Sequence, residues 1–249
     1  MTTIAKPGAE LAASLMKQSR TESLHTPMDT LLEGALAGKV TEDGLFRVLG
    51  RLWTLKRMMY YIYGGWAMGI NVNEYPATMD YLFSKQLYDD STHEMQYVDE
   101  ILRRKMARTQ SRAFAHDYCK FSETSRVAYY IFSLRALANY SQNIRIAAMN
   151  LGAKVIELEW LERLGASYPD PHVRAIFAGQ VAETRSHVLM GKLIVERFVI
   201  SDVDTALARN CCAATRKNYL FALEEFSNFA LGIPMPEDFG EAEIPEGVE

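Results

Sequence analysis

Long stretches of apolar residues with helical spacing are the feature that most constrains the fold of this chain. They recur at steps of three and four residues, and the stretch after Thr41 shows this most clearly, with Leu45, Val48, Leu49, Leu52, Leu55, Met59 and Ile62. Such spacing puts the apolar side chains on one face of an α-helix. No stretch shows the alternation of apolar and polar residues that predicts a β-strand. The sequence therefore predicts an all-α fold.

Capping and turn residues divide this pattern into separate helices. Thr26-Pro27 and Ser201-Asp202 are typical helix beginnings, and clear turns are predicted at 71–76 and 165–171. The predicted helices span residues 9–19, 27–38, 42–70, 77–108, 125–164, 172–199 and 202–232. The remaining segments are predicted as two tails, about 1–8 and 234–249, and a bend or short helix within 109–122.

Composition places the chain among ordinary globular proteins. It has 249 residues without a Pro/Gly/Ser-rich linker, so one helical domain is expected over 1–249, with four long helices as the bundle and the others packed on it. The net charge of -4 gives no general attraction to nucleic acid or anionic membranes. No stretch approaches the ~18 apolar residues of a membrane span. Three cysteines, Cys119, Cys211 and Cys212, give no disulfide framework, which fits a cytoplasmic protein.

Two similar motifs combine acids with a histidine. Asp89 and Asp90 precede His93, and Glu183 precedes His187 by four residues, in a chain with only five histidines. Each motif puts its acid and its imidazole on one helix face. If the two faces meet, they supply two nitrogens and two or three oxygens, a donor set that suits iron, manganese or zinc. The sequence predicts a metal site at these five residues, complete enough for one ion.

The first motif carries a family resemblance. Asp89-Asp90-Ser91-Thr92-His93-Glu94 resembles the Asp-Glu-x-Arg-His-Glu stretch of the ferritin-like di-iron carboxylate superfamily, which includes rubrerythrins and bacterial multicomponent monooxygenases. The resemblance covers about residues 42–200 and implies a ferritin-like four-helix bundle with flanking helices, in which Asp90 takes the place of the Glu in Glu-x-x-His. It also implies a non-haem iron oxidoreductase of the oxygenase type, acting on a small organic substrate. A homodimer or a partner subunit of an oxygenase complex is expected with it.

The chain departs from the family pattern at several ligand positions. Thr184 stands three residues before His187, where the family has a carboxylate, and Lys56 lies in the part of the first long helix that should give a Glu. The middle of the third long helix carries amides, Asn139, Gln142, Asn143 and Asn150, and its acids Glu157 and Glu159 come only near the end. Two irons would therefore be under-supplied with carboxylates.

These departures leave a second hypothesis open. In a metal-free relative, Lys56 would pair with Asp90 or Glu183 inside the bundle, because a buried charge needs a partner. The histidines would then hydrogen-bond to neighbouring side chains. The protein would be a catalytically inactive subunit or a scaffold.

A weaker resemblance points to another helical topology. Glu22 and His25 lie three residues apart, and His25-Thr26-Pro27-Met28 followed by Leu31-Leu32-Glu33-Gly34 is similar to the opening of heme-oxygenase-like proteins such as the thiaminase and pyrroloquinoline-quinone synthase families. It spans about 40 residues and implies a heme-oxygenase-like bundle with a cofactor-independent activity. The aromatic residues between Trp53 and Trp66 would line a substrate pocket or fill the core.

Overall fold

The computed structural model describes residues 7–67, 77–106 and 125–234. Every regular element in these ranges is helical, which confirms the all-α prediction. The helices are α1 (Pro7–Glu22), α2 (Pro27–Leu36), α3 (Glu42–Ala67), α4 (Ala77–Arg103), α6 (Arg126–Ala136), α7 (Gln142–Ile146), α8 (Lys154–Ser167), α9 (Pro171–Phe198) and α10 (Asp202–Leu231). The predicted turn at 71–76, the segment 109–122 and Cys119 lie outside the described residues.

The caps explain why most helix ends fall where the sequence predicts them. Ser201 Oγ accepts a hydrogen bond from the backbone N–H of Asp204 at 3.0 Å, which begins α10. Gly232 ends it with φ 65°, a left-handed conformation that glycine adopts without strain. Two predictions were wrong by a few residues, because α1 extends over Pro7–Glu22 and α4 already ends at Arg103.

The predicted helix over 125–164 is wrong, because this segment is broken in the structure. α6 ends at Ala136, a 3₁₀ turn covers Leu137–Asn139, and a π-helical segment, Ala147–Ala153, separates α7 from α8. The Arg145 guanidinium donates hydrogen bonds to the carbonyl groups of Leu137, Ala138 and Tyr140, and so satisfies backbone acceptors that the break leaves free. The break allows α8 to begin at Lys154.

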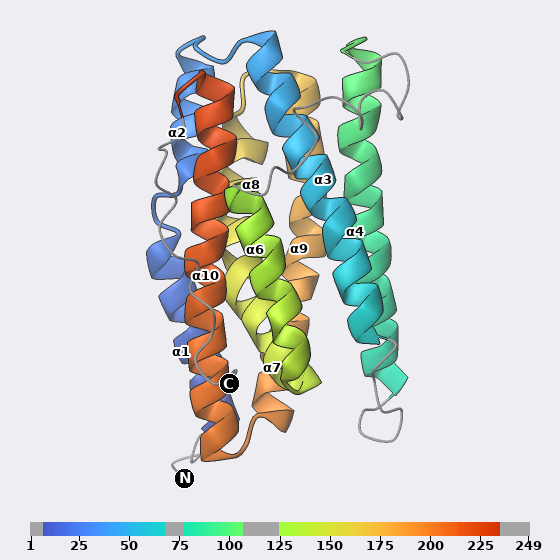
Figure 1. Cartoon of the computed structure of the whole chain (residues 1–249), viewed down its shortest axis with the longest axis vertical. Coiled ribbons are helices and arrows are strands. Elements are labelled where there is room, and N and C mark those ends of the chain that lie inside the picture. Colours follow the sequence, from blue (N-terminus) through green and yellow to red (C-terminus); the bar gives the residue numbers. More distant parts are fainter. Residues whose placement is uncertain (1–6, 68–76, 107–124, 235–249) are drawn as a thin grey trace.

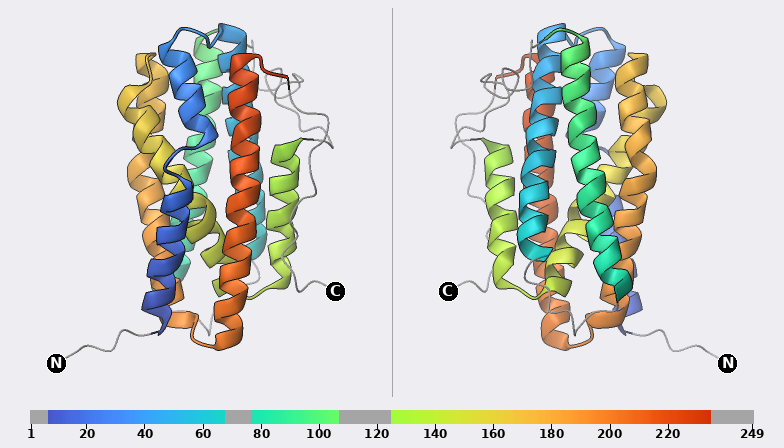
Figure 2. Two further views of the ribbon diagram at one scale, coloured as in Figure 1. Left: turned by 90° about the vertical axis from the view of Figure 1, so that its left-hand side faces the viewer. Right: turned by 90° about the vertical axis from the view of Figure 1, so that its right-hand side faces the viewer.

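The long helices lie side by side (Figure 1) and enclose a large core, beside which Phe83, Ile146, Met190 and Ile194 form a second, smaller cluster. α3 and α4 form an antiparallel pair at one edge, α9 packs against both α4 and α8, and α10 lies against α6 and α3. Figure 2 shows α4 at the outside of this arrangement, flanked by α3 and α9. The largest aromatic side chains that are fully buried are those of Trp53, Tyr63, Tyr97, Tyr130, Trp160 and Tyr219.

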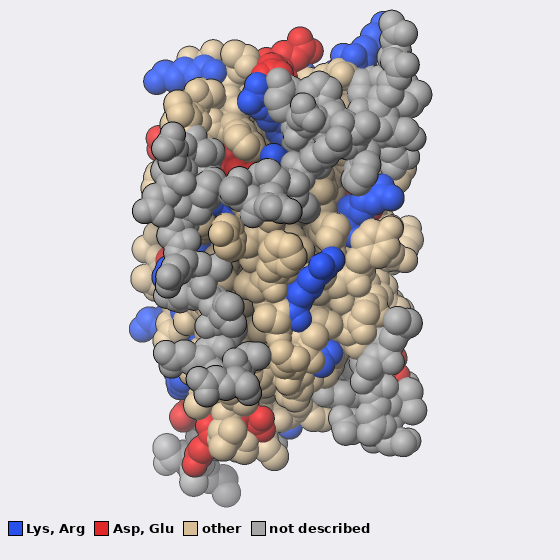
Figure 3. Space-filling view, in the orientation of Figure 1, with Lys and Arg blue, Asp and Glu red and all other residues tan. Residues whose placement is uncertain are grey.

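The aromatic residues of α3 divide between core and surface. Trp53, Tyr63 and Trp66 are buried, whereas Tyr60 and Tyr61 are exposed, so this run does not line one pocket. On the face drawn in Figure 3, Lys and Arg side chains are spread among uncharged residues instead of gathering in one patch. In the described segments, no helix combines the length and the apolar character needed to cross a bilayer.

Candidate functional site

Four charged side chains meet in the interior, between α3, α4 and α8. Lys56 Nζ lies 3.2 Å from Asp90 Oδ1, and Lys154 Nζ lies 3.0 Å from the same oxygen. Both ammonium groups also contact Glu157, Lys154 at 3.0 Å. Each of these residues is at most 4% exposed. We call the set Lys56, Asp90, Lys154 and Glu157 the central ion network. Its two positive and two negative charges balance, which buried charges require.

The network holds its carboxylates ionised. Burial alone would raise the pKa of Asp90, but the ammonium groups of Lys154 and Lys56 outweigh it and hold that pKa far below its usual range. Burial would also raise the pKa of Glu157, but the same two ammonium groups lower it to about 2. Glu157 and Asp90 in turn raise the pKa of Lys56, although burial opposes this. The pairs therefore remain charged at neutral pH.

Two histidine–carboxylate pairs connect α4 and α9 beside the network. His93 Nε2 lies 2.5 Å from Glu183 Oε2, and His187 Nε2 lies 3.0 Å from Asp89 Oδ2. Asp89 and Glu183 thus each bond to the histidine of the other helix, whereas Asp90 binds the two lysines of the central ion network. Lys85 adds a bond of 2.6 Å to Asp89 Oδ2. The five predicted site residues do come together, but Asp89 and Glu183 orient imidazole rings and do not act alongside the histidine of their own helix.

Both imidazole rings are buried, and four polar atoms near them lack a hydrogen-bond partner among the described residues. These atoms are His93 Nδ1, His187 Nδ1, Asp90 Oδ2 and Thr184 Oγ1. Burial lowers the pKa of both histidines despite their carboxylate partners, so each is neutral and donates its Nε2–H. Buried polar atoms without a protein partner are the usual positions of internal water. The region between the two histidines is therefore polar.

The residues do not fit the predicted iron. Orienting carboxylates behind two inward-facing imidazoles are typical of metal sites, and Asp90 is the nearest inward carboxylate, 3.8 Å from His93 Nδ1. However, the ammonium groups of Lys56 and Lys154 already bind Asp90 Oδ1. Their two positive charges would repel a divalent cation bound to the same carboxylate. Within the described parts of the chain, no three His, Cys, Asp or Glu side chains are grouped so that they could hold a metal ion.

Sequence reasoning missed Lys154 and Gln86, and it named Asn150 only as one of the amides in the middle of the third long helix. Lys154 stands alone in the apolar run Ala153 to Ile156, and a lone charged residue in such a run was the available signal. Gln86 and Asn150 form two reciprocal side-chain hydrogen bonds of 3.1 Å that join α4 to the π-helical segment. Their amides therefore have a structural role in the core.

The second sequence candidate, Glu22 and His25, lies at the surface. Both residues are exposed, and Glu22 Oε1 accepts a bond of 3.0 Å from Arg216 Nε, which ties α1 to α10. They do not enter the interior with the central ion network. The weaker resemblance thus gains no site from the structure.

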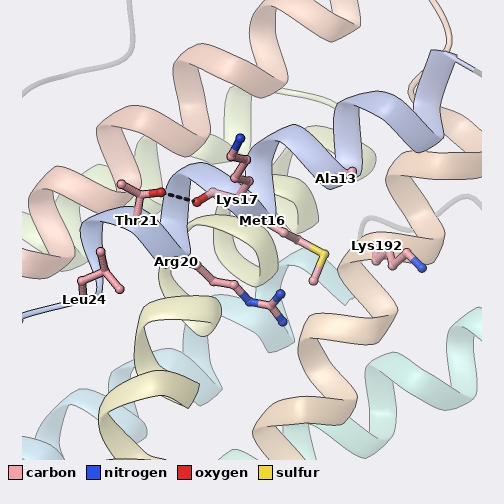
Figure 4. Close-up of a pocket in the computed structure, with 7 residues that line it drawn as sticks. All are labelled: Ala13, Met16, Lys17, Arg20, Thr21, Leu24 and Lys192. Carbon is pink, nitrogen blue, oxygen red and sulfur yellow. Dashed lines mark hydrogen bonds between the residues drawn. The ribbon is translucent and has the colours of Figure 1, made fainter.

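A surface groove of about 400 Å³ lies between α1 and α9 (Figure 4). Three cationic side chains line it, but Arg20 pairs with Glu159 at 3.6 Å and Lys192 pairs with Glu196 at 3.5 Å. Figure 4 shows that the charged ends of Lys17, Arg20 and Lys192 point in different directions. They do not converge on one anionic group, so the groove is not taken as the functional site.

The stability of the fold should fall as the pH is lowered below neutrality. Because burial lowers the pKa of His93 and of His187, the unfolded chain binds more protons than the folded protein below about pH 6.5. The free energy of unfolding therefore falls by up to about 1.4 kcal/mol per pH unit for each histidine. Asp90 and Glu157 have lowered pKa values, so their ionised carboxylates stabilise the fold above about pH 4. This stabilisation is lost as the pH falls further and the two carboxylates are protonated. Urea unfolding at a series of pH values measures both stages. A midpoint that stays constant between pH 8 and pH 5 would contradict the neutral histidines.

A scan against protein-family models, a search of curated proteins and a search of solved structures each find no match to this chain.

Proposed function

We propose that this protein is a metal-independent subunit or scaffold with a ferritin-like bundle, in which the central ion network takes the place of a metal centre. One observation carries the proposal: the ammonium groups of Lys56 and Lys154 both bridge Asp90 and Glu157 in the interior. They provide the positive charge that inward-facing carboxylates need. A bound cation is then unnecessary for charge balance.

The arrangement of the helices supports the ferritin-like part of the proposal. In that superfamily, two helices each give a Glu and two others each give a Glu-x-x-His, all projecting inward. The spacing of Glu-x-x-His occurs twice here, as Asp90 with His93 on α4 and as Thr184 with His187 on α9. The positions that correspond to the two single Glu residues would be Lys56 on α3 and Glu157 on α8. Two of these four positions differ in chemistry from the superfamily pattern, since they carry Lys56 and Thr184 in place of a carboxylate.

A second candidate is a non-haem iron, manganese or zinc oxidoreductase that acts on a small organic substrate. It is favoured by the inward-facing, unpartnered atoms His93 Nδ1, His187 Nδ1 and Asp90 Oδ2, because two imidazoles and one carboxylate are a frequent ligand set for iron. Both lysines bind the other oxygen of Asp90, Oδ1, so their positive charges would oppose a cation bound at Oδ2. The ion pairs make this the less favoured candidate.

Metal content separates the two candidates. We expect the protein expressed in medium with added iron, manganese and zinc to contain less than about 0.1 equivalent of each metal per chain, because structural and catalytic sites fill stoichiometrically. The double variant His93→Ala/His187→Ala should leave this value unchanged and lower the unfolding midpoint, since it removes two buried hydrogen-bonded side chains. Stoichiometric metal in the parent protein that disappears in the double variant would establish the second candidate instead.

A further inference from the structure

The outer face of α4 carries a stripe of large apolar side chains. Tyr81, Tyr88 and Met95 are 65%, 70% and 46% exposed, and they recur every seven residues. The opposite face of the same helix holds Asp90 and His93, so the stripe points directly away from the bundle. Residues seven apart lie on one stripe of a helix, which corresponds to one of the two apolar positions of a coiled-coil heptad, and small serines lie between them here. In Figure 2 no other helix of the described residues lies on this outer side of α4.

Two exposed tyrosines of α3 extend the apolar surface. Tyr60 and Tyr61 are 43% and 58% exposed and stack edge-to-face, with ring centroids 5.6 Å apart. The bond from Lys56 to Asp90 and the pair of Arg57 with Glu94 set the register of the two helices. Because α3 and α4 run antiparallel, Tyr60 and Tyr61 come level with the part of α4 that contains Tyr88. We call Tyr60, Tyr61, Tyr81, Tyr88 and Met95 the tyrosine face.

We propose that the tyrosine face binds the same face of a second copy of this chain, with the two α4 helices antiparallel about a two-fold axis between Ser91 and Thr92. Tyr88 of each copy then packs against Met95 of the other, and Tyr81 against Leu102. The inference rests on the proposed function, in which the protein is a subunit or scaffold that acts by binding a partner through its surface. A two-fold pairing uses one patch twice, as most homodimers do.

Charges on the rim favour this occupant and this direction. With the axis between Ser91 and Thr92, Asp80 of one copy lies opposite Arg103 of the other, and Lys85 lies beside Asp99. Lys85 also binds Asp89 and Arg103 also binds Glu100 within each chain, but 35% and 46% of these two side chains stay exposed. Both pairs occur twice by symmetry, and Asp99 is exposed. A parallel pairing would instead place Asp80 beside Asp80 and Asp99 beside Asp99. The antiparallel arrangement also sets the positive beginning of each helix dipole near the negative end of the other.

The size of the face sets the expected strength of the dimer. A stable interface buries about 800 Å² on each partner, and one helix face with two neighbouring tyrosines is at the low end of that size. We therefore expect a dissociation constant in the micromolar range. Sedimentation velocity between about 1 and 200 µM should show a monomer changing to a dimer.

Two substitutions test the face itself. Tyr88→Glu with Met95→Glu places like charges against each other across the axis, and should weaken association at least about 100-fold. Leu189→Glu is the matched control, because Leu189 is 52% exposed on α9, away from the tyrosine face. Circular dichroism checks that both variants keep the helical content of the parent. A parent that is monomeric over the whole concentration range, or a dimer that survives the double substitution, overturns this pairing.

Chemical cross-linking tests the direction. In a Cys119→Ser background, Ser91→Cys lies next to the axis and should be joined to its copy by a short bismaleimide. Ser84→Cys lies on the same face, but in the antiparallel pairing it opposes Asp99, so two such cysteines are roughly 20 Å apart along the helices. Cross-linking of Ser84→Cys would show a parallel pairing and overturn the proposed one. Metal found in the purified protein would overturn the proposed function while leaving these masses and cross-links unchanged.

Discussion

Replacing Lys154 by methionine should lower the free energy of unfolding by about 3–5 kcal/mol, the usual effect of removing one partner from a buried ion pair. Lys154 Nζ lies 3.0 Å from both Asp90 and Glu157, and its side chain is 2% exposed. Methionine has a similar length but no charge. Lys56 would then be the one cation left for two buried carboxylates. Urea unfolding at pH 7, followed by circular dichroism, measures the change.

The control for this prediction removes charge in a balanced way. The double variant Lys154→Met/Glu157→Gln leaves Lys56 paired with Asp90 and should recover at least half of the loss, because no excess negative charge remains. Lys192→Met changes the same residue type on α9, where the side chain is 43% exposed, and should change stability by less than about 0.5 kcal/mol. A loss below about 1 kcal/mol for Lys154→Met would show that the network is not a buried, mutually dependent set of charges.

The helices could be predicted from the sequence because their signals are local. The apolar period, Thr26 before Pro27, and Ser201 with Gly232 at the ends of α10 all act within a few residues. The break between α6 and α8 could not be predicted in this way. It depends on Arg145 reaching three carbonyl groups of the preceding turn, and on Gly152, where a Cβ would lie 3.2 Å from the carbonyl oxygen of Cys212 on α10. Such contacts exist only after the helices have packed.

The site shows the same division between local and tertiary information. Motif spacing correctly indicated that Asp90, His93 and His187 face the interior, and the pairing of Lys56 with Asp90 was one of the two alternatives for that lysine. Spacing could not indicate that Asp89 bonds to His187 and Glu183 to His93 across two helices. Spacing also could not indicate that the Lys154 side chain points into the interior, because this depends on where α8 begins after the π-helical segment. Helix period gives the face of a residue, but not the partner on another helix.

Replacing the network by a full ligand set should convert the protein into a metal-binding one. The triple variant Lys56→Glu/Lys154→Met/Thr184→Glu gives one carboxylate from α3, Glu157 from α8, and an acid-x-x-His from both α4 and α9, which is the ferritin-like arrangement. The substitutions change the charge of the interior from balanced to about four negative, which two divalent cations offset. We expect about two equivalents of iron or manganese per chain after expression in supplemented medium, against none for the parent.

The triple variant should also depend on metal for its stability, because its four carboxylates repel one another when no cation is bound. We expect its thermal unfolding midpoint to rise on addition of manganese, while the midpoint of the parent stays constant. The matched control Thr184→Gln has a side chain of the same size as Thr184→Glu without its charge and keeps both lysines, and it should bind less than about 0.1 equivalent. If the triple variant folds with parent-like circular dichroism and binds no more metal than this control, then α3, α4, α8 and α9 do not present their inward positions to a common centre, and the ferritin-like assignment fails.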